Sequence, residues 1–275
     1  MKAVGYQKSL PIEAADSLVD FEIAKPEPKG RDIRVAVKAI SANPVDYKVR
    51  KRAAPTDGGT KILGFDAAGV VEAVGPDVSL FKPGDEVFYA GSIARAGGNS
   101  ERHLVDERIV GRKPRSLSFA EAAALPLTAI TAWELLFERL QLVEGQGAGQ
   151  QLLIVGAAGG VGSIMLQLAR QLTKVSVIAT ASRPETQAWA RELGAHHVID
   201  HSQPLHAELQ RAGFASVSHV ASLTQTDQHF DQLVEALTPQ GRLALIDDPA
   251  QLDVAKLKRK SLSLHWEFMY TRSLF

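Results

Sequence analysis

Residues 151–162, QLLIVGAAGGVG, decide the fold of this chain. The apolar half of this stretch predicts a buried strand, and the glycine-rich half predicts a tight turn. Residues 164–172 follow with a helical pattern. A strand, a glycine-rich turn and a helix in this order are typical of the first unit of a parallel α/β sheet.

The spacing within the glycine cluster suits a dinucleotide. Ala157, Gly159 and Gly162 occupy the three positions of a G-x-G-x-x-G pattern, with alanine in the first. Glycine lets a pyrophosphate approach main-chain N–H groups, and the helix N-terminus attracts its charge. A glycine cluster by itself also occurs in simple tight turns, and the flanking strand and helix favour the cofactor interpretation. The predicted phosphate-binding residues are Gly159, Gly160, Val161 and Gly162.

Strands and helices continue to alternate after the cluster. Further strands are expected at 175–179, 198–200, 219–222 and 243–246, and further helices at 184–193 and 230–237. Strands separated by helices pair in parallel, with helices on both faces of the sheet. The second half is therefore predicted to be a doubly wound parallel-sheet domain.

The end of the second strand bears on the choice of cofactor. An acidic residue there would bind the ribose of NAD, but this chain reads Thr180-Ala181-Ser182-Arg183. A hydroxyl and a guanidinium group suit the additional phosphate of NADP. We therefore predict NADPH, bound by Ser182 and Arg183; the alternative is that Arg183 is an ordinary exposed residue. Ser222, at the end of another expected strand, lies where such sheets bind ligands.

The first half of the chain has a different pattern. Short strands are expected at 34–40, 69–75 and 86–90, separated by turns rich in proline and glycine, which is typical of a compact β domain. Near residue 116 the pattern becomes helical, with Ser118 and Glu121 spaced as a capping box. We place the domain boundary between residues 123 and 124.

The composition excludes several classes of protein. The 275 residues include 31 basic and 31 acidic side chains, no cysteine, and only 6% aromatic residues. Disulfides and cysteine-ligated metals are excluded, and neither nucleic-acid nor membrane binding is expected. The basic clusters at 50–52 and 256–260 are expected to be solvated surface. With no signal peptide recognised, we expect a cytoplasmic protein.

Five motifs together carry a family resemblance. They are NPVD at 43–46, GFDAAGVV at 64–71, FKPGDEV at 81–87, LPLTAITA at 125–132 and the cluster at 157–162. The chain resembles the zinc-free quinone oxidoreductase branch of the medium-chain dehydrogenase/reductase superfamily, from residue 1 to about residue 270. The resemblance implies a GroES-like substrate domain at 1–123, a Rossmann domain at 124–275, and NADPH-dependent reduction of quinones, enones or related carbonyls by a homodimer.

The resemblance also bears on metal binding. Zinc-dependent members place a cysteine at Asn43, a His-Glu pair at Phe65 and Asp66, and a third ligand near Leu127. Asparagine, phenylalanine and leucine cannot form a tetrahedral zinc site, so we predict no metal. A conjugated substrate agrees with that prediction, because conjugation spreads the negative charge that a metal would otherwise stabilise.

Asn43 and Lys48 are the predicted catalytic residues. The Asn43 amide is expected to donate a hydrogen bond to a substrate oxygen or to the nicotinamide ribose, although an asparagine before Pro44 also suits a turn. Lys48, or its neighbour Tyr47, is expected to supply a polarising donor or a proton, unless the pair is simply exposed. Thr131 resembles a family position on the nicotinamide side of the cofactor; the alternative is a threonine inside a helix.

The last residues leave two alternatives open. The family continues with a return to the N-terminal domain, whereas this sequence ends at Phe275, so either it is a piece of a longer chain or the return is missing. Residues 263–270 read as an apolar strand that by family analogy joins a dimer sheet; the alternative is a plain core strand. An NADPH-binding sensor or structural module without turnover is the alternative function.

Overall fold

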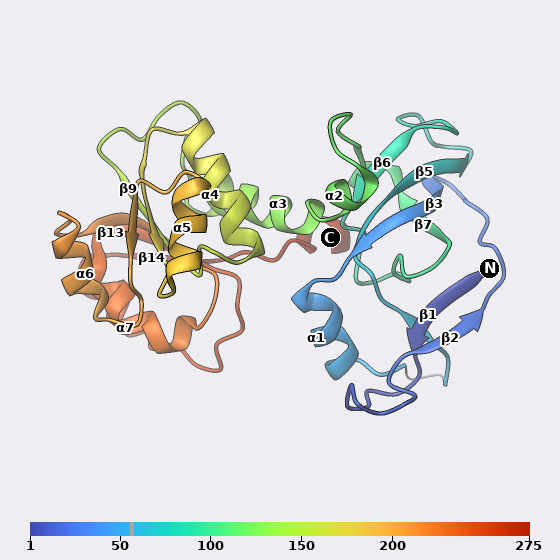
Figure 1. Cartoon of the computed structure of the whole chain (residues 1–275), viewed down its shortest axis with the longest axis horizontal. Coiled ribbons are helices and arrows are strands. Elements are labelled where there is room, and N and C mark those ends of the chain that lie inside the picture. Colours follow the sequence, from blue (N-terminus) through green and yellow to red (C-terminus); the bar gives the residue numbers. More distant parts are fainter. Residues whose placement is uncertain (56–57) are drawn as a thin grey trace. The chain divides into compact units, whose positions relative to one another are not determined.

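The computed structural model describes residues 1–55 and 58–275 and forms two compact units (Figure 1). Unit 1 is Met1–Leu127 together with Tyr270–Phe275, and unit 2 is Thr128–Met269. The units divide after Leu127, whereas the sequence predicted a domain boundary between residues 123 and 124. Among the described residues, no helix combines the length and apolar character that a bilayer crossing needs.

Unit 2 is built on a six-stranded parallel sheet. In spatial order its strands are β11 (His197–Ile199), β10 (Ser176–Thr180), β9 (Gln151–Val155), β12 (Val217–Ser222), β13 (Leu237–Leu245) and β14 (Ser263–Trp266). The first strand of the unit is central, and the chain then winds outward in both directions. This 3-2-1-4-5-6 order is that of the Rossmann fold, which confirms the predicted doubly wound sheet.

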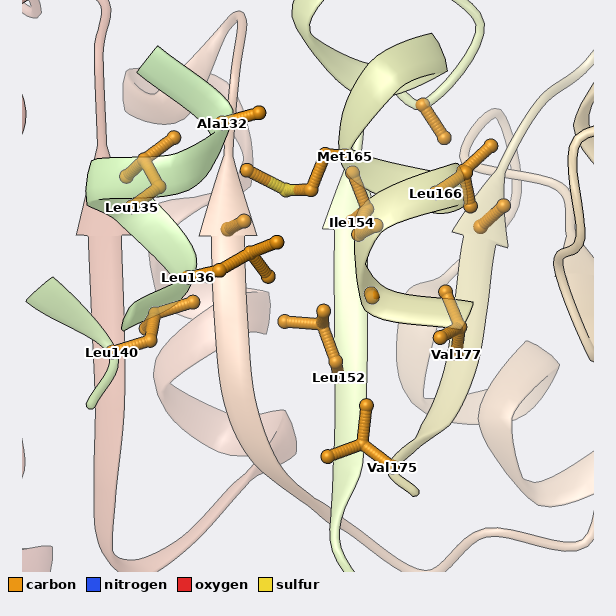
Figure 2. Packing of buried hydrophobic residues seen from close by; sticks show 14 of the residues in the cluster. Ala132, Leu135, Leu136, Leu140, Leu152, Ile154, Met165, Leu166, Val175 and Val177 are labelled. Atoms are coloured by element: carbon orange, nitrogen blue, oxygen red, sulfur yellow. The ribbon is translucent and has the colours of Figure 1, made fainter. Parts of the chain in front are cut away.

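Helices cover both faces of this sheet. They are α3 (Pro126–Trp133), the π-helical segment η2 (Glu134–Arg139), α4 (Gly160–Leu172), α5 (Pro184–Glu192), α6 (Leu205–Arg211) and α7 (Thr226–Ala236). Successive side chains of β9 point to opposite faces, as strand geometry requires. Figure 2 shows Leu152 and Ile154 packed with Met165 of α4 and Leu136 of η2. Leu153 and Val155 instead join the cluster formed with α6 and α7.

Unit 1 is rich in antiparallel strands. A five-stranded sheet contains, in spatial order, β7 (Arg102–Asp106), β3 (Asp32–Ser41), β5 (Asp66–Val74), β6 (Glu86–Tyr89) and β8 (Gly111–Arg112). A three-stranded sheet contains β2 (Val19–Glu22), β1 (Lys2–Tyr6) and β4 (Lys61–Ile62). The helices α1 (Pro44–Arg52) and α2 (Phe119–Ala123) accompany these strands. The predicted capping box is present at the start of α2, where Ser118 and Glu121 exchange hydrogen bonds.

The strand predicted over residues 263–270 is shorter in the structure. It ends at Trp266, because its partner strand β13 ends opposite, at Leu245, and the ladder has no further residue to pair with. Tyr270 belongs to unit 1, where its buried ring packs edge-on against Phe65 with 5.8 Å between ring centroids. The short helix α8 (Thr271–Leu274) follows in the same unit.

Candidate active site

The glycine turn of unit 2 begins with a residue that only glycine suits. Gly156 has φ +77°, a conformation that other residues adopt at a cost. A Cβ atom there would lie 3.0 Å from the methyl group of Thr224. The Gly156 N–H donates to Thr180 Oγ1 over 3.2 Å, which ties the turn to the end of the neighbouring strand β10. Nothing in the sequence assigns a role to Thr180, since only the fold brings it beside Gly156.

The next glycines begin helix α4. Gly159 is the N-cap and has no side chain to satisfy the first helical amides. Gly159 and Gly160 are exposed, so main-chain N–H groups of the first turn are accessible to an anion. Gly162 has another role: a Cβ there would lie 2.4 Å from the carbonyl oxygen of Ala157. Its lack of a side chain allows the helix to pack closely on the turn.

The other predicted cofactor residues are distributed over unit 2. The sheet register aligns Ala179 of β10 with Ile154, and Ser222 with Val155, so these strands end at the same edge. The predicted residues that follow or end these strands at that edge are Gly159, Gly160, Val161, Gly162, Ser182, Arg183 and Ser222. Thr131 is different: it lies inside α3 and is 2% exposed.

The proposed 2′-phosphate residues are on the surface. Ser182 is exposed, and the Arg183 side chain is 71% exposed. Arg183 Nε lies 3.3 Å from Oε1 of Glu185, in the first turn of α5. An exposed ion pair of this kind is worth little, so a phosphate group can compete with Glu185 for the guanidinium.

Ser222 differs from the exposed pair because it is fully buried. Its hydroxyl lies 2.7 Å from Thr226 Oγ1, and Thr226 in turn donates to Asp247. The structure thus engages the predicted cofactor residue Ser222 in an internal hydrogen-bond network. Nothing in the sequence assigns a role to Thr226, because that role depends on its contact with Asp247 beyond the end of another strand.

In unit 1, three residues far apart in the sequence meet around one carboxyl group. Asp66 is completely buried at the start of β5. Its Oδ2 accepts a hydrogen bond from Asn43 Nδ2 and its Oδ1 accepts one from the Leu127 main-chain N–H, each over 2.8 Å. These are the positions at which the resemblance places metal ligands in zinc-dependent enzymes. Here they form a hydrogen-bond network.

Electrostatics in this network favour a neutral acid. Burial raises the pKa of Asp66 to about 7, against the opposing effect of the two hydrogen bonds it accepts. The nearby Asp46 adds a smaller increase. Asp46 itself has a structural role, because Oδ2 accepts from the Asn43 main-chain N–H and Oδ1 from the Gly64 N–H, over 2.8 and 2.9 Å. Burial also raises the pKa of Asp46.

The residues at this place do not fit a zinc ion. Asn43 and Asp66 are bonded to one another, Phe65 packs against Tyr270, and Leu127 contributes an amide that donates to Asp66. Over residues 1–55 and 58–275, no group of three or more histidine, cysteine or acidic side chains is arranged to hold a metal. His103 is buried, with Nδ1 3.0 Å from the Tyr89 hydroxyl and Nε2 2.8 Å from the Ala96 carbonyl oxygen.

The two predicted catalytic residues both belong to the N-terminal half of α1. Asn43 is the N-cap, and Lys48 is a half-buried residue within the helix. Tyr47 is 57% exposed. The second N–H of the Asn43 amide faces the Ser41 carbonyl oxygen at 3.5 Å, which is at the limit of a hydrogen bond. That N–H can therefore be given to another acceptor at little cost.

The basic clusters make contacts within the protein. Arg50 donates to the Leu10 carbonyl oxygen over 2.7 Å, and Lys256 pairs with Asp231. Lys260 Nζ donates to carbonyl oxygens at the end of α7, including that of Leu237. A cation at a helix C-terminus stabilises that end.

Comparison with known proteins agrees with both units. Residues 29–132 match the family described as alcohol dehydrogenase GroES-like domain, and residues 160–275 match the family described as zinc-binding dehydrogenase. A zinc-type alcohol dehydrogenase-like protein of Staphylococcus aureus is 39% identical over 277 residues, spanning 100% of this chain and 82% of the relative. The predicted GroES-like and Rossmann architecture is thereby confirmed.

Two solved structures extend the comparison. One, from Rhizobium etli and provisionally assigned as a zinc-dependent alcohol dehydrogenase, is 59% identical with a TM-score of 0.95, over 100% of this chain and 80% of that one. The other, Escherichia coli quinone oxidoreductase complexed with NADPH, is 25% identical with a TM-score of 0.83, over 98% of this chain and 81% of that one.

Proposed function

Because this chain belongs to the medium-chain dehydrogenase/reductase superfamily, it is a nicotinamide-dependent oxidoreductase, and we propose that it is a zinc-independent, NADPH-dependent reductase of quinones, enones or related conjugated carbonyls. The observation that carries this proposal is the hydrogen-bond network of Asn43, Asp66 and Leu127. It occupies the place of a metal site with one carboxyl group, one side-chain amide and one main-chain N–H, a set that cannot form a tetrahedral zinc site.

The residues of unit 2 fit NADPH. The exposed start of α4 at Gly159 and Gly160 suits the pyrophosphate, which can approach main-chain N–H groups of the first helical turn there, and Ser182 and Arg183 suit the 2′-phosphate. No acidic residue stands between the end of β10 and Arg183, and the carboxylate of Glu185, which follows in α5, is held only in an exposed ion pair with Arg183. When bound, NADPH supplies the hydride. The NADPH complex of the Escherichia coli quinone oxidoreductase supports this choice by analogy.

The chemistry of unit 1 favours a conjugated acceptor. Asp66 holds the Asn43 amide by one N–H, and the second N–H makes only a 3.5 Å contact. We assign that second N–H to the substrate oxygen, where negative charge develops. A single neutral donor stabilises charge less than a metal ion does. Conjugation in a quinone or enone spreads the charge and reduces what the protein must stabilise.

The proposal includes a homodimer formed through β14. This strand is an edge of the parallel sheet, and its last residue, Trp266, is 51% exposed. Phe268, just beyond it, is 43% exposed. Exposed edges and apolar side chains together favour pairing with a second copy. Light scattering of wild type and Trp266→Glu tests this: a monomeric wild type would contradict the dimer. The cytoplasmic location stays a prediction.

The decisive experiment measures cofactor binding and turnover on the same preparation. Fluorescence titration should give much tighter binding of NADPH than of NADH, and equal affinity would contradict the roles of Ser182 and Arg183. Stopped-flow oxidation of NADPH should occur with quinones and enones and not with unactivated ketones. Zinc at one equivalent per chain in elemental analysis would contradict the metal-free site. Tight NADPH binding without turnover on any acceptor would favour a binding module instead.

A further inference from the structure

Three polar side chains form a connected network at the ends of β12 and β13. Ser222 and Thr226 are fully buried, and Asp247 lies two residues beyond the end of β13. Asp247 Oδ1 accepts from the Thr226 hydroxyl over 2.5 Å, and Oδ2 accepts from the Thr226 main-chain N–H over 2.8 Å. Because the Thr226 hydroxyl gives its proton to Asp247, the Ser222 hydroxyl must donate to Thr226, over 2.7 Å.

This network anchors the N-terminus of α7. The N-cap residue, Gln225, makes no capping hydrogen bond with its side chain. Asp247, which follows β13, caps the helix instead. It accepts a hydrogen bond from the main-chain N–H of Thr226, the first residue of the helix. A carboxyl group at a helix N-terminus also interacts favourably with the helix dipole. The start of α7 is therefore fixed relative to the edge of the sheet.

The loop of residues 223–225, between Ser222 and Thr226, is strained and lies beside the glycine turn. Gln225 has φ +51° and ψ +37°, the left-handed region that a residue with a side chain occupies only at a cost in free energy. Leu223 extends β12 by donating to the Val155 carbonyl oxygen over 3.1 Å. The Thr224 methyl lies 3.0 Å from the Cβ position of Gly156. Thr224 and Gln225 are exposed.

We propose that Asp247 is a positioning residue of the cofactor site, which holds residues 223–225 in their strained conformation beside the glycine turn. The inference rests on the proposed dinucleotide function. The adenosine half of a dinucleotide follows the edge toward β10, so the loop after β12 is available to the nicotinamide half. Thr224 and Gln225 are the groups that Asp247 places there.

The test uses Asp247→Asn, with Asp248→Asn, a change in the adjacent exposed residue, as the matched control. We expect Asp247→Asn to weaken NADPH binding about tenfold in fluorescence titration. Binding of 2′,5′-ADP, which probes only the adenosine half, should stay within twofold of wild type. Hydrogen exchange of the amides at 223–226 in the cofactor-free protein should accelerate at least tenfold. The control should change none of these quantities.

A second substitution separates positioning from general stability. Glycine adopts the left-handed region without strain, so Gln225→Gly in the Asp247→Asn background should restore the slow exchange of the loop. If Asp247→Asn does not fold, Thr226→Val removes the hydroxyl link while keeping the main-chain N–H, and it should show the same pattern to a smaller degree.

The outcomes distinguish this inference from the proposed function. Wild-type protein that binds neither NADPH nor NADH would refute the function itself. If Asp247→Asn binds NADPH as tightly as the wild type does, only the inference is overturned. An equal loss of 2′,5′-ADP binding would also overturn it, because it would show that the change disturbs the whole edge of the sheet.

Discussion

Asp66→Asn gives the most direct test of the carboxyl group that stands in the metal position. Burial raises the pKa of Asp66 from 3.8 to about 7. Each pKa unit is worth about 1.4 kcal/mol, so this increase corresponds to about 4 kcal/mol. Because the folded protein binds this proton more tightly than the unfolded chain, the contribution of Asp66 to wild-type stability is greatest at low pH. It falls as the pH rises from about 4 to about 7, and this contribution is flat above that window.

The variant lacks this titration, since asparagine carries no acidic proton. It also loses one of the two acceptors, an offset of about 1–3 kcal/mol that does not depend on pH. The stability of wild type minus that of Asp66→Asn should therefore fall by about 3 kcal/mol between pH 5 and pH 8.

Urea denaturation followed by far-ultraviolet circular dichroism at pH 5, 6, 7 and 8 measures this difference, because that signal reports on both units, whereas all three tryptophans lie in unit 2. Subtracting the variant removes the contribution of every other titrating group that the two proteins share. Asp20→Asn, at an exposed position of β2, serves as the control and should stay parallel to wild type throughout. Parallel profiles for wild type and Asp66→Asn would refute the assignment of a largely neutral acid at this site near pH 6.

Other substitutions separate packing from binding and test the remaining titrations. A Cβ at residue 160 meets a threonine methyl group at 3.2 Å, whereas one at residue 162 lies 2.4 Å from a carbonyl oxygen. Gly162→Ala should thus lower Tm by several degrees, while Gly160→Ala should keep Tm and weaken NADPH binding in titration; equal Tm values would contradict this division. Burial and a hydrogen bond with Glu134 raise the pKa of Glu267, so stability falls as pH rises above the ordinary value of 4.5. Glu267→Gln should reduce the loss of unfolding free energy between pH 6 and 8 in urea titrations. An unchanged slope against pH would contradict the raised pKa of Glu267. Burial lowers the pKa of His103 to about 4, so stability is lost as pH falls from 6.5 toward 4. His103→Gln should reduce the Tm difference between pH 7 and pH 5, and an undiminished difference would show that other groups cause it.

Features that depend on neighbouring residues could be predicted from the sequence. The glycine turn, the alternation of strands and helices, and the capping box of Ser118 and Glu121 are each encoded within a few residues. The parallel pairing of the strands follows from the helices that separate them along the chain. The fold and the position of the glycine turn could therefore be predicted from the sequence, and the binding of a cofactor at that turn stays a prediction.

Contacts between distant residues could not be predicted in this way. Neither Thr180 nor Thr226 stands out in the sequence, and each acts on a residue of another strand end or turn. The strand expected over 263–270 was too long because its length is set by where β13 ends, which the apolar pattern does not show. The pairing of Arg183 with Glu185 was likewise missed, although the two residues are neighbours, because flexible side chains on the surface have several partners within reach.

In the proposed reductase, the hydrogen-bond network around Asp66 links a metal-free site to a conjugated substrate. One N–H of the Asn43 amide is committed to Asp66, and the other makes a weak contact with Ser41. A preorganised donor is worth about 3–4 kcal/mol toward a developing oxyanion, and this amide offers a single such donor. An isolated ketone concentrates a full negative charge on one oxygen, so it needs more than this donor provides. A quinone or enone shares that charge between oxygen and carbon, and it can be reduced where only one neutral N–H meets the oxygen.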